Sequence, residues 1–105
     1  MRGNMGALLK QAQRVQENIK RLQVEMEKLE IQGEASGGLV QVTMTGKHVL
    51  KSVKIDPSLM QEDVDMLEDL VFMAVKNCLE KIEETSKEKM AKATAGMPLP
   101  PGMMF

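Results

Sequence analysis

The sequence is nearly devoid of aromatic residues. Its 105 residues include two phenylalanines and no tryptophan or tyrosine, so the apolar mass comes from leucine, valine, isoleucine and eleven methionines. A chain of this size buries a small core, and such chains often gain stability when a second subunit buries more apolar surface. Single-stranded nucleic acids stack on exposed aromatic side chains. The composition therefore favours an oligomer and argues against a single-strand binder.

Cysteine and histidine each occur once, as Cys78 and His48. A single cysteine excludes an internal disulfide and a cysteine-based metal cluster, which fits a reducing, cytoplasmic compartment. Cys78 lies on the apolar side of a predicted helix, where cysteine behaves as a small core residue. His48 lies near a predicted hairpin turn. This inventory predicts that the protein is not an enzyme and has no metal, no cofactor and no small-molecule substrate.

Long apolar runs are also missing. No segment approaches the ~20 apolar residues that a membrane-spanning helix needs, and the N-terminal residues lack the apolar stretch of a signal peptide. The sequence therefore predicts no membrane association.

Charge is present in quantity but unevenly distributed. The formal net charge is −1, yet residues 1–24 carry five cations against one acid, and residues 56–70 carry six acids and no cation. A partner responds to the local field rather than to the total charge. Near-neutrality therefore excludes little.

Apolar residues recur at alternating spacings of three and four along the first third of the chain, which predicts a helix over residues 5–30 with a heptad seam. The seam consists of Met5, Leu8, Ala12, Val15, Ile19, Leu22, Met26 and Leu29. At ~1.5 Å per residue this helix is roughly 39 Å long. A domain this small does not cover such a helix, so part of it should project.

The apolar period then changes to two, which predicts strands over residues 31–36, 39–45 and 48–55 in an antiparallel meander. Gly46 is expected to supply the positive φ of a two-residue hairpin turn, Gly46-Lys47. Lys51 shares the parity of Val53 and Ile55. That placement predicts a bulge, a frayed end or a sheet face that is only partly covered.

A second helix is predicted over residues 62–94, because acids at its start complement the positive end of the helix dipole and a broad apolar stripe follows. This stripe is the one available to cover the sheet. The Pro/Gly/Met-rich residues 96–105 are predicted to form a flexible tail. We therefore predict an α+β fold with one domain over residues 1–95, in which a three-stranded meander packs on the second helix and the N-terminal helix projects.

Cations follow one line of the predicted helix over residues 5–30. Lys10, Arg14, Arg21 and Lys28 fall within roughly 40° of one another at ~100° per residue, with Lys20 beside the line. Such a line suits phosphate contacts along a groove, but it equally suits the solvated outer face of a coiled coil. A weaker basic cluster closes the second helix, where acids dilute Lys87, Lys89 and Lys92.

The whole sequence resembles the YbaB/EbfC family of small bacterial nucleoid-associated proteins. The resemblance begins with "MGALLKQAQRVQENI" and continues through "EIQGEASGGLVQVTMTGKH". Its most distinctive part is "VKIDPSLMQEDVDMLEDLV", followed by "KIEETSKEKMA" and "GMPLPPGM". It implies a homodimer of α-β-β-β-α protomers with projecting helical arms, which binds double-stranded DNA in the nucleoid and influences nucleoid organisation and gene expression.

The resemblance also implies that the ends of the helices contact DNA. Transferred by region and charge, the matching DNA-binding cations are Arg2, Lys10, Arg14, Lys20, Arg21, Lys87, Lys89 and Lys92. The net acidity departs from the composition of a strong DNA binder.

Two alternatives remain open at this point. A prefoldin-like holdase or scaffold also joins two helices through a hairpin, and methionine-rich surfaces suit adaptable protein binding. In that case the two helices would pair with each other, whereas here the stripe of the second helix fits a sheet better. A recombination-linked accessory role is the other alternative.

Overall fold

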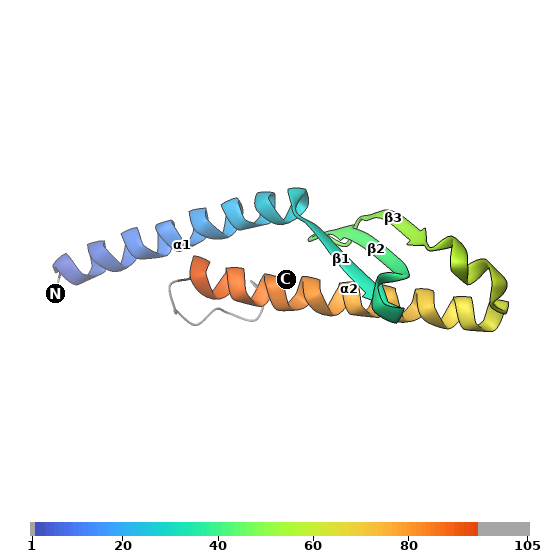
Figure 1. Ribbon diagram of the computed structural model, residues 1–105. Helices are drawn as coiled ribbons and strands as arrows, with labels where there is room; N and C mark the ends of the chain where they lie inside the picture. Colours follow the sequence, from blue (N-terminus) through green and yellow to red (C-terminus); the bar gives the residue numbers. More distant parts are fainter. Residues whose placement is uncertain (1, 95–105) are drawn as a thin grey trace.

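The computed structural model describes residues 2–94, with side chains from Met5 onward, and shows an elongated molecule (Figure 1). Its principal extents are 72 × 20 × 20 Å and its radius of gyration is 19.3 Å, against about 13 Å for a compact chain of this length. The tail predicted over residues 96–105 lies outside the described residues. The elongation comes from two long helices that overlap along part of their lengths.

The order of elements confirms the predicted α+β fold. The elements are α1 (Arg2–Lys28), β1 (Glu30–Ala35), the 3₁₀ turn η1 (Ser36–Gly38), β2 (Val40–Thr45), β3 (Leu50–Ile55), the 3₁₀ turn η2 (Pro57–Gln61) and α2 (Val64–Ala93). Asp63 caps the start of α2, because its Oδ1 accepts a hydrogen bond of 2.8 Å from the Met66 backbone N–H.

The three strands form an antiparallel meander in the order β1-β2-β3. β1 and β2 pair without interruption, from Glu30 opposite Thr45 to Ala35 opposite Val40. The pairing of β2 with β3 shifts between Thr43 and Met44, which leaves Lys51 as the extra residue. Of the three outcomes that the parity of Lys51 left open, the structure shows the bulge.

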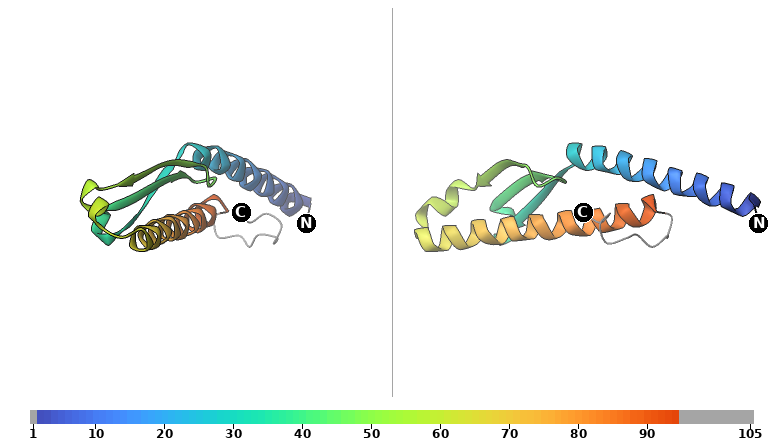
Figure 2. Two further views of the ribbon diagram at one scale, coloured as in Figure 1. Left: turned by 90° about the vertical axis from the view of Figure 1, so that its right-hand side faces the viewer. Right: turned by 180° about the vertical axis from the view of Figure 1, so that it is seen from behind.

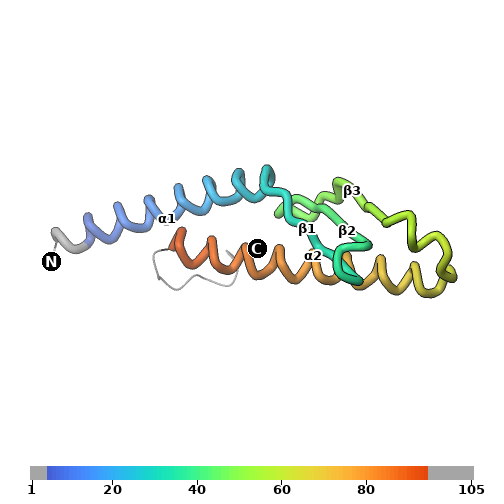
Figure 3. Tube along the Cα trace, in the orientation of Figure 1, coloured from blue at the N-terminus to red at the C-terminus, as the bar shows by residue number. Residues whose placement is uncertain are grey.

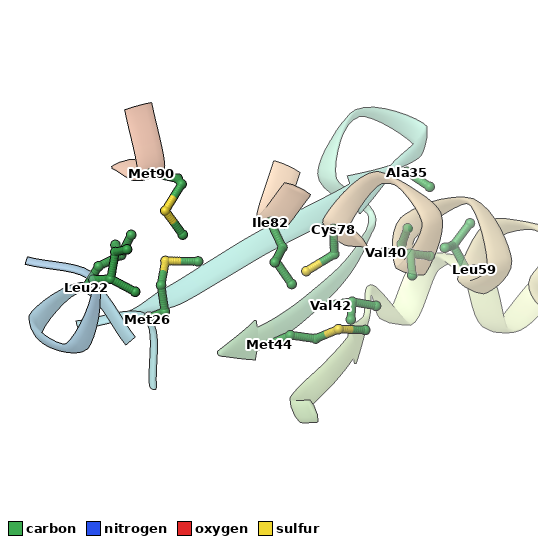
Figure 4. Packing of buried hydrophobic residues seen from close by; sticks show 12 residues of the cluster. Leu22, Met26, Ala35, Val40, Val42, Met44, Leu59, Cys78, Ile82 and Met90 are labelled. Carbon is green, nitrogen blue, oxygen red and sulfur yellow. The ribbon is translucent and has the colours of Figure 1, made fainter. Parts of the chain in front are cut away.

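The core lies between the sheet and α2, which packs mainly on β1 and to a lesser extent on β2 (Figures 2 and 4). Val40 and Val42 are fully buried against the helix. Gly33 allows the closest approach, because a Cβ at this position would overlap the backbone of Cys78 and Ala74. The small residues of α2 therefore lie directly on β1.

Side chains of α2 also close the outer edge of β1. The Asn77 Oδ1 accepts a hydrogen bond of 3.0 Å from the Glu34 backbone N–H, and the Lys81 Nζ donates one of 3.2 Å to the Gln32 carbonyl. These bonds satisfy backbone groups that an edge strand otherwise exposes. β3 forms the other edge of the sheet, on the side away from this helix contact.

The prediction for the turn between β2 and β3 was wrong in two respects. The loop runs from Gly46 to Val49, closed by a hydrogen bond of 2.9 Å from the Thr45 N–H to the Val49 carbonyl. His48, not Gly46, adopts the positive φ, at 67°. Gly46 is required instead by packing, because a Cβ there would lie 2.6 Å from the Met26 Cε and 2.7 Å from the Met26 carbonyl oxygen.

Only part of the heptad seam of α1 is buried. Ile19, Leu22 and Met26 pack into the core, whereas Leu8 and Met5 are exposed. α1 extends past the C-terminal end of α2, so these N-terminal residues have no neighbouring element among those described (Figures 1 and 3). The predicted projection of this helix is confirmed.

Candidate functional site

A cleft of about 340 Å³ lies where α1 passes the end of α2. Its walls are Asn18, Arg21, Leu22, Glu25, Lys89, Lys92 and Ala93. We call it the inter-helix cleft. It brings together three of the predicted DNA-binding cations, Arg21 from α1 and Lys89 and Lys92 from α2.

Apolar packing and one side-chain hydrogen bond fix the two helices at this point. Leu22 of α1 is buried and lines the cleft together with Ala93 of α2. The Asn18 Nδ2 donates a hydrogen bond of 3.2 Å to the Ala93 carbonyl, and the Thr94 Oγ1 donates one of 3.3 Å to the Ala91 carbonyl. Free carbonyls at a helix C-terminus repel anions. Because these two carbonyls are bonded, and Lys92 lies in the last turn of α2, the negative end of that helix is partly offset.

The cleft holds three cations and one acid. The Lys89 Nζ lies 3.5 Å from the Glu25 Oε2, and both side chains are partly exposed, at 37% and 55%. An ion pair with this exposure contributes only about 0–1 kcal/mol. Arg21 and Lys92 are exposed and have no ion-pair partner among residues 5–94. The cleft is therefore electropositive and open to an anion.

The other predicted cations lie away from this cleft. Lys10 and Arg14 are exposed on the projecting part of α1, and Arg14 lies two helical turns from Arg21 on the same side of the helix. Lys20 is also exposed but points ~100° away from Arg21. Thus α1 continues the positive surface of the cleft toward its N-terminal end.

Lys87 is separated from its neighbours in the predicted cluster. Its Nζ lies 3.3 Å from the Glu83 Oε1, one helical turn away, and it borders a different cavity together with His48. The side chain of Arg2 lies outside the described residues. The structure therefore groups three of the eight predicted residues and leaves Lys87 on another side of α2.

Sequence analysis missed Asn18 and Glu25 as members of the site. The signal was present in the spacing, because Arg14, Asn18, Arg21 and Glu25 follow one another at intervals of four, three and four along α1. That spacing marks one stripe of a helix. The stripe borders the apolar seam, so it meets whatever packs on the seam, here the end of α2.

The remaining chemistry-bearing side chains are accounted for by the fold. Cys78 is buried, and its Sγ donates a hydrogen bond of 3.2 Å to the Ile31 carbonyl. Across the described part of the chain, no group of histidine, cysteine or acidic side chains is arranged to hold a metal ion. Likewise, neither described helix has a stretch apolar enough to cross a bilayer.

Comparisons with known proteins agree with the fold and identify the family. Among solved structures, a crystal structure of an uncharacterized protein from Helicobacter pylori superposes with a TM-score of 0.62. The two sequences are 24% identical, and the match covers 80% of this chain and 86% of the other, which shows a shared fold. The sequence model of the YbaB/EbfC DNA-binding family matches residues 1–97, nearly the whole chain. The protein therefore belongs to the YbaB/EbfC DNA-binding family.

Proposed function

We propose that this protein binds double-stranded DNA through phosphate contacts from the inter-helix cleft and the projecting part of α1, and that it acts as a homodimer in the nucleoid of the cytoplasm. The observation that carries the proposal is the convergence of Arg21, Lys89 and Lys92 on one open cleft. Lys10 and Arg14 extend the same positive surface. Organisation of the nucleoid and influence on gene expression would follow from such binding.

The type of contact follows from the residues at the surface. Lysine and arginine neutralise phosphates and release counterions, so affinity falls steeply as salt concentration rises. The two described helix surfaces offer little for reading base edges beyond glutamines such as Gln11 and Gln13 on α1, which are also ordinary helix-surface residues. Binding is therefore expected to be largely tolerant of sequence.

An apolar surface beside β3 supports the homodimer. Leu50, Val53 and Ile55 of β3 lie opposite Met44, Val42 and Val40 of β2, so they share the face of the sheet that α2 covers elsewhere. Because α2 does not extend under β3, Val53 is 44% exposed although Val42 is fully buried. The same alternating pattern is thus buried on one strand and uncovered on the next.

α2 contributes further exposed apolar residues, one of which lies near the turn into β3. Phe72 is 68% exposed, and Leu79, seven residues later, is also exposed and borders a cavity with Gly46 and His48 at the turn into β3. Residues seven apart point in nearly the same direction on a helix. We call Leu50, Val53, Ile55, Phe72 and Leu79 the uncovered face. A second copy that brings the same face would bury apolar surface on both subunits, which a chain with so few aromatic residues needs.

The prefoldin-like alternative receives less support from the fold. It requires two helices that pair with each other along their lengths. Here α2 packs mainly on β1 and β2 and meets α1 only toward its own C-terminal end. We therefore retain DNA binding as the proposal and a recombination-linked role as one of its possible settings.

A gel shift with a duplex of about 100 base pairs, repeated across a salt series, tests the proposal. We expect a slope of log affinity against log salt of about −4 to −7, as for a footprint of four to eight phosphates. Replacement of both Arg21→Gln and Lys92→Gln should flatten the slope by about 2. Lys54→Gln, which removes an exposed lysine from β3, is the matched control and should leave the slope unchanged. Absence of a shift at low salt would refute DNA binding.

A further inference from the structure

Glu25 is the acidic residue in the wall of the inter-helix cleft, and its carboxylate faces Lys89 across it. We propose that Glu25 is an internal competitor for DNA: its carboxylate occupies the place beside Lys89 that a backbone phosphate takes when the duplex binds. This inference rests on the proposed function and deepens it, because it names the residue that limits the affinity of the site.

The geometry of Lys89 is the first argument. Its side chain is more buried than that of Glu25, at 37% against 55% exposed, and it lines the cleft together with Leu22 and Ala93. Glu25 is therefore the more solvated partner of the pair. Of the two side chains, Glu25 can move away from the ion pair more easily. Its movement would leave the Lys89 ammonium group, which lines the cleft, open to a phosphate.

The composition of the cleft is the second argument. A carboxylate and a phosphodiester carry the same charge and present two oxygens to a cationic donor. Arg21 of α1 and Lys92 of α2 line the same cleft without an ion-pair partner among the described residues. A phosphate that replaces Glu25 would therefore meet three cations, whereas Glu25 is placed 3.5 Å from one of them. Replacement of the Glu25 carboxylate by a phosphate is therefore expected to be favourable, although the Glu25–Lys89 ion pair must break first.

The position of Glu25 along α1 is the third argument. It follows Arg14, Asn18 and Arg21 on one stripe and is the first acid of a segment, residues 25–36, in which acids outnumber cations. Lys28, three residues further along α1, belongs to the same line of cations, so Glu25 interrupts the positive surface close to the sheet. A duplex lying along α1 meets this carboxylate there, where it weakens binding.

The test compares two neutralising substitutions on the same helix. Glu25→Gln should tighten binding about fivefold near 0.15 M salt and steepen the salt slope by about 0.9, the effect of one additional phosphate contact. Glu27→Gln is the matched control, because Glu27 is exposed on α1, has no ion-pair partner among residues 5–94 and points ~200° away from Glu25. It should change affinity less than twofold. Equal gains in both variants would show a general charge effect and overturn the inference.

A second pair of measurements separates competition from other roles. In a Lys89→Gln background, Glu25→Gln should raise the DNA affinity much less, because the lysine that the substitution would free is absent. A full increase in affinity in that background would contradict the inference. A lowered thermal midpoint together with weaker binding in Glu25→Gln would instead identify a structural clamp between the helices, and would also overturn it. If the unmodified protein binds no duplex at low salt, the proposed function itself fails. If the unmodified protein binds the duplex and both glutamate substitutions raise the affinity equally, only the role of Glu25 is refuted.

Discussion

The part of the molecule within reach of α2 differs sharply from the part beyond it. Leu22 and Leu8 occupy the same heptad seam of α1, yet Leu22 is 4% exposed and Leu8 is 61% exposed. The difference arises because α2 ends beside Asn18, so that only the later turns of the seam have a helix to pack on.

The sheet repeats this contrast. β2 and β3 carry the same alternation of apolar residues, but α2 covers β2 and leaves β3 at the uncovered face. An amphipathic pattern indicates that one face of an element is buried, but it does not identify the element that packs on that face. In this protein the buried half of each pattern meets α2, and the exposed half is available to a second copy or remains in solvent.

The largest effect is expected from a matched pair of leucine truncations in α1. Leu22→Ala should lower the free energy of unfolding by about 2–4 kcal/mol, because it opens a cavity between the two helices. Leu8→Ala should lower it by less than about 0.5 kcal/mol, as for a surface substitution. Urea unfolding at a fixed protein concentration measures both. A comparable loss in Leu8→Ala would mean that the projecting seam is buried in the assembled protein, and the contrast drawn here would fail.

Val53→Lys on the uncovered face should change the stability of the fold less than Leu22→Ala does, but it should strongly weaken the dimer. A buried lysine without a partner is costly at an interface, so light scattering should report a monomer while far-UV circular dichroism keeps the helical signal. The matched control is Lys54→Glu, because Lys54 points to the opposite face of β3, opposite Gln41. A dimer that persists in Val53→Lys would place the interface elsewhere.

The smallest effect on stability is expected at the turn that leads from β3 into α2. The Ser58 backbone N–H donates a hydrogen bond of 2.9 Å to the Asp56 Oδ1, and this bond holds the pKa of Asp56 below its ordinary value. A lowered pKa in the folded state means that this carboxylate stabilises the fold above about pH 4 and that its contribution is lost as the pH falls through the folded-state pKa. The stability difference between the protein and Asp56→Asn should therefore shrink below pH 4, as thermal melts across pH can measure. A difference that is constant with pH would contradict this reading.

The sequence was sufficient to predict the candidate cations, but their grouping depends on how the two helices meet. The candidate cations could be named because their charges and helical spacing are visible in the sequence. Their grouping was not visible there, since Arg21 and Lys89 are distant in the chain and only the contact near Leu22 brings them together. Lys87 was assigned with Lys89 and Lys92 by proximity in sequence, but two residues along a helix correspond to a rotation of ~200°, which puts it on another side.

The turn between β2 and β3 shows the same limit at shorter range. A glycine between two strand patterns indicates a turn, and the turn is there. Its glycine meets a packing requirement that only the tertiary structure shows, because the side chain and carbonyl of Met26 lie too close to Gly46 for any Cβ, and the left-handed conformation falls on His48 instead.

Periodicity, turn residues and charge order are local properties, and from them the sequence alone determined the succession of elements, the meander and the cationic character of α1. The tertiary structure alone decided which apolar stripes are buried, which cations share a cleft and that Glu25 stands among them. The physical reason is that burial and charge pairing depend on distances between segments far apart in the chain, and those distances are set by close packing around Gly33, Leu22 and Met26.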